Sequence, residues 1–471
     1  MTEPLWTWGD LLAASGAVAD GAPEAQITGF SLDTRSLQTG EVFVAIRDVR
    51  DGHDFVLEAF RKGAAAALVE AGYRRVAGDG ALLRVDNPLE GLRSIARAAR
   101  ARSQAGIVAI TGSVGKTGTK EALRACLSRL GETHAAEKSF NNHWGVPLTL
   151  ARMPVSARYG VFEIGMNHAG EIAPLSRLVR PQVAIITTVE PVHLQFFSSV
   201  ADIAQAKAEI FAGLEPDGTA VLNRDNPHFD LLQRRAREAK ARVISFGRHT
   251  DADVRPEVLT LGADGSEIVA RFGDKRVTYR LAAPGGHIAQ NSLAVVAALF
   301  ALGADVEAAV PALAGITAAK GRGARRELAI NGGAILLIDE SYNANPASMR
   351  SALAAMAAVP RQRFQRRIAV LGDMLELGDD SGRLHEDLKE PVDAAEVDLV
   401  FACGPHMQRL YAALPAARRG EWGSTSQDIL GPLVAAVRAG DVVMIKGSLG
   451  SRMEPLVEAL ARKAETGPVA R

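Results

Sequence analysis

The sequence of 471 residues has little of several residue types, and each shortage excludes a class of protein. It contains only two cysteines, Cys126 and Cys403, which excludes a disulfide framework and a cysteine-rich metal site. Aromatic residues make up 5%, too few for the stacking platforms of single-stranded nucleic-acid binders. Neither charge is in excess, because Lys plus Arg and Asp plus Glu each number 54. A generally basic nucleic-acid binder and a strongly acidic disordered chain are therefore excluded.

Long apolar runs are lacking as well. No segment offers about 18 consecutive uncharged apolar residues, so we expect no membrane span. The first ten residues lack the basic start and the apolar core of a signal peptide. Together with the scarcity of cysteine, these features predict a cytoplasmic protein. What is present is 47% hydrophobic and 23% charged residues, which is enough apolar mass for several globular cores.

The length and the pattern of apolar runs predict three α/β domains. Val- and Ile-rich runs alternate with helical segments, which favours parallel sheets covered by helices. We expect a small mixed α/β domain over 1–86, a central parallel-sheet P-loop domain over 87–316, and a Rossmann-like α/β domain over 317–471. Residues 253–280 predict an antiparallel meander, and the alternation of strands and helices restarts after the polar Gly/Arg stretch 320–326. The expected strands are 27–32, 41–46, 81–85, 106–111, 159–164, 182–189, 219–223, 242–246, 334–339, 367–371, 399–403 and 442–446.

Residues 109–120, Ala-Ile-Thr-Gly-Ser-Val-Gly-Lys-Thr-Gly-Thr-Lys, predict a phosphate-binding loop. A strand enters the segment, a glycine-rich turn follows, and a helix leaves it. Gly112 and Gly115 let backbone N–H groups converge on phosphate oxygens, and the helix N-terminus adds partial positive charge. Lys116 supplies a point charge for the β- and γ-phosphates, and Thr117 offers a hydroxyl to Mg²⁺.

This loop is a shortened variant, because Ile110 stands where the standard P-loop has a further glycine. The alternative is a tight strand-to-helix turn that carries a surface lysine. The presence of strand, Gly-Lys-Thr and helix together favours the phosphate site. The loop alone does not separate kinases, GTPases, motors and ligases. A guanine-reading Asn-Lys-x-Asp is missing, since Asn223-Arg-Asp-Asn226 places its acid one position early.

Three further residues are candidates for a metal shell or a catalytic role. Glu163 ends an expected strand, and His193 follows the next one, where ligands gather at the edge of a parallel sheet. Both could reach a Mg²⁺ that bridges nucleotide phosphates. The alternatives are a solvated loop acid and a loop histidine with ordinary hydrogen bonds. Lys207 lies on an expected helix and, from the residues alone, reads as a solvated lysine.

Several separate blocks together resemble the Mur ligase family, the ATP-dependent amide-forming ligases of peptidoglycan precursor synthesis. The resemblance covers nearly the whole chain, and the shortened loop is the family's own variant. Residues 339–346 (Asp-Glu-Ser-Tyr-Asn-Ala-Asn-Pro) and 371–378 (Leu-Gly-Asp-Met-Leu-Glu-Leu-Gly) are the most diagnostic pair. The other blocks are residues 31–35, 40–45, 51–55, 111–117, 140–147, 163–167 and 446–448.

The resemblance implies roles for individual residues. Lys116, Glu163, His193 and Lys207 are implied in catalysis, and Lys207 matches the lysine that carries a carbamate in the family. The implied metal ligands are Thr117, Glu163, His193 and Lys207. The implied ATP-binding residues are Gly112, Ser113, Val114, Gly115, Lys116, Thr117, Gly118, Asn291, Arg322 and Asp339. The implied substrate-binding residues are Ser31, Asp33, Thr34, Arg35, Asp51, His53, Asn141, Asn142, Tyr342, Asn343, Asn345 and Lys446.

Three positions depart from the common family pattern. Ile288 stands where many relatives have Asn, Glu340 replaces an Asp, and Leu449 stands where Arg is common. These departures put local contacts in question, while the blocks around them keep the family pattern.

The implied reaction joins D-alanyl-D-alanine to a UDP-N-acetylmuramoyl-tripeptide through an acyl phosphate, giving the pentapeptide nucleotide, ADP and phosphate. It needs ATP and Mg²⁺, two ions by the family pattern, and a monomer is expected, with no nucleic-acid partner. Two alternatives stay open. One is the related ligase that adds the third peptide residue, although its Asp-Asn-Pro-Arg tetrapeptide is missing from this sequence. The other is a P-loop regulatory NTPase that uses its flanking domains as binding modules.

Overall fold

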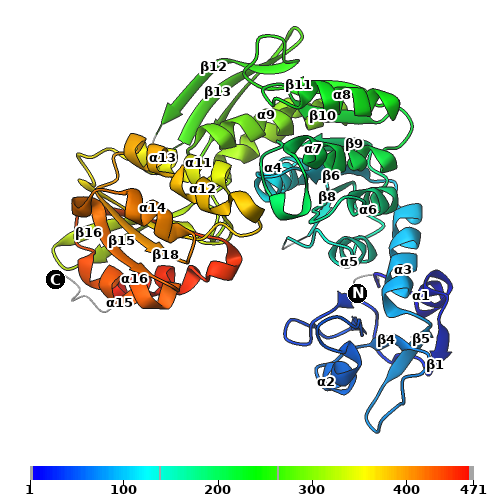
Figure 1. Ribbon diagram of the computed structural model, residues 1–471. Coiled ribbons are helices and arrows are strands. Elements are labelled where there is room, and N and C mark those ends of the chain that lie inside the picture. Colours follow the sequence, from blue (N-terminus) through cyan, green and yellow to red (C-terminus); the bar gives the residue numbers. More distant parts are fainter. Residues whose placement is uncertain (1–3, 137–138, 263–264, 466–471) are drawn as a thin grey trace.

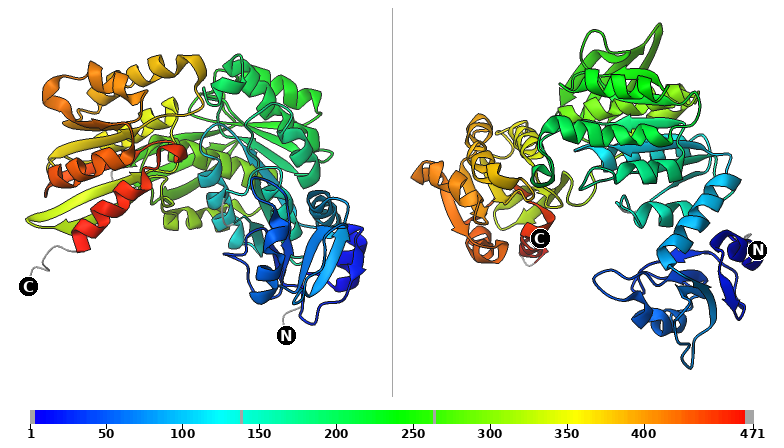
Figure 2. Two further views of the ribbon diagram at one scale, coloured as in Figure 1. Left: turned by 60° about the horizontal axis from the view of Figure 1, so that its bottom comes forward. Right: turned by 45° about the vertical axis from the view of Figure 1, so that its right-hand side comes forward.

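The structure, a computed structural model, describes residues 4–136, 139–262 and 265–465. Within these ranges, three β-sheets of five, nine and six strands follow one another along the chain. Figure 1 and Figure 2 show the central region between the other two, so that the first and third regions approach it from different sides. The chain is therefore an α/β protein with three sheet-containing regions, as predicted.

The first region holds a five-stranded sheet of order β1-β5-β4-β3-β2, parallel except for β1. β4 is a strand that the sequence analysis did not expect. Its segment follows a run of alanines, which favour helices, and only pairing with β3 and β5 makes it a strand. The elements are α1 Trp8–Ser15, β1 Val18–Asp20, β2 Gly29–Ser31, β3 Glu41–Val44, η1 Gly52–Phe55, α2 Val56–Arg61, β4 Ala66–Glu70 and β5 Ala81–Val85.

The first region is fastened to the central one through the helices α3 (Pro88–Arg102) and α5 (Gly145–Ala151). Apolar side chains of both helices belong to the same buried cluster as those of the first sheet. The indole N–H of Trp6 donates to the carbonyl of Ala151 at 3.0 Å, and Arg152 Nε donates to the carbonyl of Phe30 at 2.7 Å. Apolar packing and directional bonds therefore hold these two regions together.

The central region is built on a nine-stranded sheet of order β14-β13-β12-β11-β10-β9-β6-β8-β7. Its strands from β7 to β12 are parallel, and β12, β13 and β14 form the antiparallel meander that was predicted. Its strands are β6 Gly106–Thr111, β7 Thr133–Ala135, β8 Tyr159–Glu163, β9 Val183–Ile186, β10 Thr219–Asn223, β11 Arg242–Phe246, β12 Val254–Gly262, β13 Gly265–Phe272 and β14 Lys275–Leu281.

Helices cover both faces of this sheet and bury two separate apolar clusters against it. α9 lies on one face, with buried alanines, valines and leucines along most of its length. The helices are α4 Lys116–Ser128, α6 Ile172–Val179, η2 Leu194–Phe196, α7 Val200–Ala208, η3 Glu209–Gly213, α8 Phe229–Glu238, α9 Gly286–Ala301, α10 Val306–Ala309 and η4 Val310–Gly315.

The third region is an open sheet of order β15-β16-β20-β17-β18-β19, parallel except for the edge strand β15. It is covered by helices on both faces, as predicted for a Rossmann-like region. The strands are β15 Ala324–Ile330, β16 Gly333–Glu340, β17 Arg366–Gly372, β18 Leu399–Cys403, β19 Arg419–Gly423 and β20 Asp441–Lys446. The helices are α11 Pro346–Ala357, η5 Gly378–Asp380, α12 Ser381–Glu386, α13 Lys389–Ala394, α14 Met407–Ala413, η6 Ala416–Arg418, α15 Ser426–Ala436, η7 Leu449–Ser451 and α16 Glu454–Glu465.

The polar Gly/Arg stretch 320–326 runs into a strand that the sequence analysis did not expect. β15 begins at Ala324 and pairs with β16 in a hairpin, so Arg325 and Arg326 lie in a strand. Charged residues on an edge strand are common, because they discourage pairing with another chain. The domain limits near 86 and 316 themselves remain predictions. No helix among the described residues is both long and apolar enough to cross a membrane.

Candidate active site

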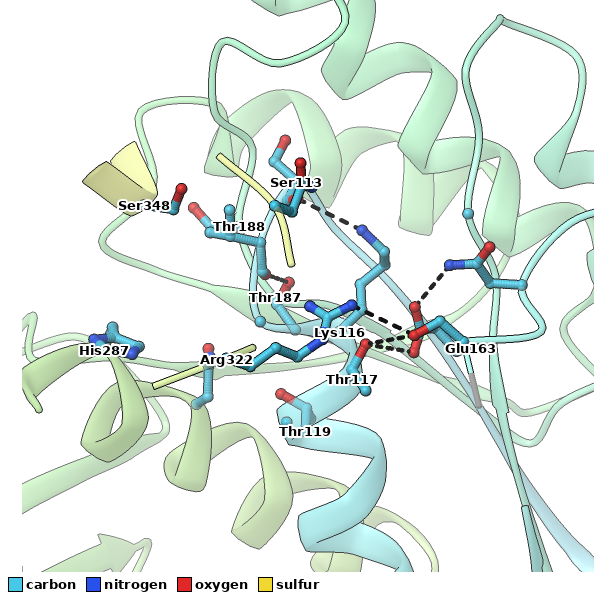
Figure 3. A pocket seen from close by; sticks show the side chains of 18 of the residues that line it. Ser113, Lys116, Thr117, Thr119, Glu163, Thr187, Thr188, His287, Arg322 and Ser348 are labelled. Atoms are coloured by element: carbon cyan, nitrogen blue, oxygen red, sulfur yellow. Dashed lines mark hydrogen bonds between the residues drawn. The ribbon is translucent and has the colours of Figure 1, made fainter. Parts of the chain in front are cut away.

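The parallel strands β8, β6 and β9 are adjacent in the central sheet, and their carboxyl ends meet at one edge. In sheets of this kind, ligands bind in the crevice outside these ends. A cavity of about 1510 Å³ opens here and is lined by residues of the central and third regions. Figure 3 shows part of its lining, with Lys116, Thr117 and Arg322 beside Glu163. We therefore take this cavity as the candidate active site.

The loop between β6 and α4 has the glycine requirement that the sequence predicted. Gly112 and Gly115 have φ angles of 149° and 86°. A Cβ atom on Gly112 would lie 1.9 Å from Thr187 Oγ1, and one on Gly115 would lie 2.3 Å from Asn291 Nδ2. Any side chain at either position would clash with a neighbour. Glycine at both positions therefore allows the loop to lie close to the segment after β9 and to α9. Its chain then enters α4, whose first amide groups and dipole suit an anion.

Lys116 is the first residue of α4, and its ammonium group folds back over the loop. Its Nζ donates to the carbonyl of Gly112 at 2.7 Å. A longer bond of 3.5 Å, from the same Nζ to the carbonyl of Ser113, is drawn in Figure 3. Burial lowers the pKa of Lys116, the nearby Glu163 opposes this shift, and the positive charge of Arg322 adds to it. The cavity therefore has two cations in its lining, Lys116 on the P-loop wall and Arg322 on the wall of the third region.

Glu163, the last residue of β8, is 2% exposed and receives two side-chain hydrogen bonds. Thr117 Oγ1 donates to its Oε2 at 2.9 Å, and Asn141 Nδ2 donates to its Oε1 at 2.8 Å. The predicted neighbours Thr117 and Glu163 are thus brought together across 46 positions of sequence. The pair offers a hydroxyl oxygen and a carboxylate, which are the ligand types that Mg²⁺ prefers.

His193 lies past the end of β9 in a left-handed backbone conformation, with φ of 56°. Its Nδ1 lies 2.5 Å from Oε2 of Glu376, which belongs to the third region. Burial lowers the pKa of His193, the charge of Glu376 opposes the shift, and Lys207 and Lys116 add to it. His193 is part of the cavity lining, together with Lys116.

Lys207, on α7, is not the solvated lysine that the residues alone suggested. Its side chain is 2% exposed, and among the described residues it has no hydrogen bond or ion pair. Burial lowers the pKa of Lys207 well below its usual value, and the charge of Lys116 adds to the shift. A lone buried ammonium group is costly, so this position favours either a neutral amine or a chemical change of the group.

The residues present fit Mg²⁺ that arrives together with a nucleotide. The described part of the chain holds no cluster of three His, Cys, Asp or Glu groups that could bind a metal alone. It does bring the Thr117 hydroxyl and the Glu163 carboxylate to one point, and His193 lies on the same cavity. Mg²⁺ commonly uses one or two protein carboxylates and completes its shell with substrate phosphates and water.

The third region contributes five of the predicted ATP- or substrate-binding residues to the cavity lining, and their binding roles remain predictions: Arg322, Tyr342, Asn343, Asn345 and Lys446. The guanidinium group of Arg322 stacks on the ring of Tyr342 at 4.1 Å, a cation–π contact. Its Nη2 also donates to Ser139 Oγ at 3.4 Å, across the boundary between regions. These residues therefore face the P-loop from the opposite wall.

Lys446 and Glu340 explain one departure from the family pattern. Lys446 is 2% exposed, and its Nζ donates to Glu340 Oε2 at 3.1 Å and to the carbonyl of Asn343 at 2.9 Å. The longer Glu side chain thus keeps a carboxylate on the buried lysine. Of the other two departures, Ile288 lines the cavity, and Leu449 is exposed on η7.

Among the predicted ATP-binding residues, Asp339 lies outside the cavity lining, whereas Asn291 is part of it. Asp339 is buried, and its carboxylate accepts from the backbone N–H of Gly321 at 2.9 Å and from the hydroxyl of Ser341 at 2.6 Å. It therefore fixes the turn that presents Arg322. A contact between Asp339 and nucleotide remains a prediction.

The predicted residues of the first region do not line this cavity. Asp51 accepts from the backbone N–H of His53 at 3.0 Å and bonds its ring Nδ1 at 2.6 Å, while His53 Nε2 accepts from the N–H of Glu70 at 3.0 Å. Arg35, largely exposed, pairs with Asp33 at 2.6 Å. Ser31 and Thr34 are buried. Substrate binding by these six residues remains a prediction.

Several cavity residues were missed by the sequence analysis. Thr187 and Thr188 come directly after β9, and Thr187 Oγ1 donates to the carbonyl of Val114 at 2.6 Å, which ties the loop to the sheet. Their place after a strand could have marked them, because strand ends form this edge. Arg93 and Arg97 of α3 also line the cavity, and only the packing of α3 could reveal that.

Comparisons with known proteins agree with this geometry. The family model "Mur ligase middle domain" matches residues 110–299, and "Mur ligase, glutamate ligase domain" matches residues 321–449. The chain is 35% identical over 432 residues to the UDP-N-acetylmuramoyl-tripeptide–D-alanyl-D-alanine ligase of Escherichia coli (strain K12), covering 91% of this chain and 92% of that protein. It is 32% identical over 440 residues to the protein of the same name in Bacillus subtilis (strain 168), covering 92% and 93%.

Solved structures agree over nearly the full length. A crystal structure of MurF from Acinetobacter baumannii is similar with a TM-score of 0.83 and 29% identity, covering 98% of this chain and 99% of that one. MurF ligase from Thermotoga maritima in complex with ADP gives a TM-score of 0.77 and 27% identity, covering 93% and 98%. The family models together with relatives of this identity and coverage establish that the chain belongs to the Mur ligase family.

Proposed function

We propose that this protein is the ATP-dependent ligase that joins D-alanyl-D-alanine to UDP-N-acetylmuramoyl-tripeptide in peptidoglycan precursor synthesis. The observation that carries the proposal is the cavity between the central and third regions, with the P-loop, Lys116 and Glu163 on one wall and Arg322 and Lys446 on the other. The relatives that match over about 90% of the chain bear this name. The relative in complex with ADP supports nucleotide use by the same fold.

The chemistry needs a carboxylate to be activated before an amine can attack it. The terminal carboxylate of the tripeptide attacks the γ-phosphorus of ATP, the bond to the β-phosphate oxygen breaks, and ADP leaves. The amine of D-alanyl-D-alanine then attacks the carbonyl carbon of the acyl phosphate. The tetrahedral intermediate collapses, phosphate departs, and the amine loses a proton. Amide, ADP and phosphate are the products.

Charge repulsion is the main obstacle to the first step, because a carboxylate must approach a phosphate. Two unit charges 4 Å apart repel by about 4 kcal/mol at an effective dielectric constant of about 20. Lys116 and Arg322 face this approach from two walls and reduce the repulsion. Thr117, Glu163 and His193 would hold a Mg²⁺ that binds with the nucleotide, and the ion would supply further positive charge against the same repulsion.

Lys207 is proposed to carry a carbamate. The amine is buried, has no partner among the residues that the structure describes, and has a lowered pKa, which supports the carbamate because a neutral amine can add to carbon dioxide and lose a proton. The product is an anion in place of a cation, beside the positive charge of Lys116. A mass gain of one carbamate at Lys207, and rescue of Lys207→Ala by short carboxylates, are the expected results. Absence of both would refute the carbamate.

The three regions are proposed to divide the substrates among them. Ser31, Thr34 and Arg35 lie in the region assigned to the uridine nucleotide, the central region binds ATP, and Tyr342 and Asn343 lie on the wall assigned to the dipeptide. The contacts of Asp51 and His53 hold their loop in shape for that purpose. Variants of Arg35 should weaken binding of the uridine nucleotide and leave ADP binding unchanged in calorimetry.

We further propose a cytoplasmic monomer. Both cysteines are free and buried, which suits a reducing compartment. Sedimentation at assay concentration should give the mass of one chain, and a dimer would refute the monomer.

The decisive experiment is a substrate-omission assay read by mass spectrometry of the nucleotide product. Phosphate release should require both the tripeptide nucleotide and D-alanyl-D-alanine, and the product should be the pentapeptide nucleotide. Steady ATP hydrolysis without either substrate would instead identify a regulatory NTPase. Extension of the dipeptide nucleotide by one amino acid would identify the ligase of the preceding step.

A further inference from the structure

A hydrogen bond between two regions involves the cavity residue His193. Its Nδ1 lies 2.5 Å from Oε2 of Glu376, and the two residues are 183 positions apart. His193 belongs to the central region, and Glu376 belongs to the third region, just before η5. The side chains are about a quarter and two-fifths exposed, at 26% and 43%. The bond therefore lies at the rim of the cavity, where the regions meet.

The backbone around this bond is shaped for the contact. His193 and Glu376 both have left-handed conformations, with φ of 56° and 63°, which are unusual for residues other than glycine. The N–H of Gln195 donates to the carbonyl of Glu376 at 3.2 Å, so main chain and side chain meet at the same point. The Glu376 loop is anchored by a bond of 2.9 Å from the N–H of Leu375 to Ser448 Oγ.

The bond determines which nitrogen of His193 can bind a ligand. A carboxylate only accepts, so Nδ1 must carry the proton that it donates to Glu376. In the neutral ring, the lone pair is then on Nε2. Among the described residues, Nε2 has no hydrogen-bond partner, and His193 lines the cavity. Metal-binding histidines commonly donate their second N–H to a carboxylate in this way, which sets the tautomer and the ring orientation.

We propose that Glu376 is a positioning residue that presents Nε2 of His193 to the metal, so that the third region sets the geometry of a ligand on the central region. The proposal rests on the metal role of His193 given under Proposed function. It goes beyond that role, because Glu376 has been assigned no part in metal binding, ATP binding or substrate binding. Approach of the third region and binding of the metal with nucleotide would then favour each other.

The test uses the full chain and measures binding of ADP with Mn²⁺ by calorimetry and by the electron paramagnetic resonance signal of the ion. Glu376→Ala should weaken Mn²⁺-dependent ADP binding by about 10- to 100-fold, the usual effect of losing such a partner. Glu376→Gln should recover part of the loss, because its amide oxygen still accepts from Nδ1–H. ADP binding measured without a divalent ion should be the same in all variants.

Asp379→Asn is the matched control. Asp379 is exposed on η5 in the same loop, and the carboxylate bonded to His193 is that of Glu376, so this variant removes one negative charge and keeps the hydrogen bond. It should bind Mn²⁺ with ADP like the unaltered protein. A loss in Asp379→Asn equal to that in Glu376→Ala would show that the charge of the loop matters rather than the bond, and would overturn the proposal.

Nitrogen-15 spectra of the metal-free protein give a second readout. His193, assigned with a His193→Gln variant, should show a protonated Nδ1 in the unaltered protein and a tautomer mixture in Glu376→Ala. The same tautomer in both proteins would overturn the proposal. The variant His193→Ala separates the metal-binding role of His193 from the positioning role of Glu376. If it leaves Mn²⁺ binding intact, the metal role fails, and the positioning fails with it. If it abolishes binding while Glu376→Ala does not, the positioning alone fails.

Discussion

The substitution Gly112→Ala gives the sharpest test of how the P-loop is held. Gly112 has φ of 149°, and a Cβ atom there would lie 1.9 Å from Thr187 Oγ1 and 3.2 Å from the backbone nitrogen of Thr187. The hydroxyl of Thr187 cannot turn away freely, because it donates to the carbonyl of Val114 at 2.6 Å. The added methyl group must therefore break that bond or displace the loop.

The magnitude follows from two costs. A residue other than glycine in a sparsely populated backbone region costs about 1–3 kcal/mol. Loss of the Thr187 bond leaves buried polar groups unpaired, which costs about 1–3 kcal/mol. We expect Gly112→Ala to lower the stability of the central region by about 2–6 kcal/mol if the loop keeps its shape. If the loop moves instead, the loss should appear in ADP binding.

Scanning calorimetry of the central-region transition and ADP titration measure both outcomes. Gly118→Ala is the control for stability, because its Cβ would meet nothing within 4 Å and its site lies in α4. Alanine in place of glycine inside a helix should stabilise by about 0.5–1 kcal/mol. A Gly112→Ala variant with unchanged unfolding and unchanged ADP affinity would refute the reasoning.

Three further predictions concern other parts of the molecule. Lys116→Ala should reduce phosphate release at least about 100-fold, because a charge aimed at the phosphates is removed, and near-normal turnover would refute its role. Burial lowers the pKa of His385, so the unfolded chain binds the extra proton more readily than the folded chain. The free energy of unfolding should therefore fall as the pH drops below about 6.5, until the pKa of the folded state is reached. Because His134, His193 and His287 also have pKa values lowered by burial, denaturant titrations should show a slope that His385→Asn reduces by at most about 1.4 kcal/mol per pH unit. Arg152→Met should destabilise the junction with the first region by about 1–3 kcal/mol, since the carbonyl of Phe30 loses its donor, and an unchanged calorimetric transition would contradict this.

The sequence was most informative for segments whose own residue pattern agrees with their position in the folded sheet. β6 and β18 have the bounds that their apolar runs predicted, because a strand in a parallel sheet is buried on both faces and its sequence is nearly continuously apolar. The sequence was least informative for β4 and β15. β4 has an alanine-rich sequence with no clear period, and β15 is an edge strand with charged side chains. Their pairing partners, distant in sequence, make them strands.

The same distinction holds for the site. The P-loop could be identified from the sequence because its residues are consecutive, and Glu163 because it ends a recognisable strand. Lys207 was read as solvated from its own helix, whereas packing buries it beside Lys116. The role of Asp339 in fixing the Arg322 turn also depends on a contact between separate segments.

The sequence by itself determined the α/β class, the phosphate loop and the family, because each depends on local patterns or on consecutive residues. The tertiary structure alone decided that Lys207 is buried, with no partner among the described residues, that Lys446 is paired with Glu340, and that Glu376 reaches His193 from another region. Burial and hydrogen-bond partners are properties of neighbours in space. A single chain position carries no record of which distant segment will lie against it, so these features appear only when the three regions are assembled.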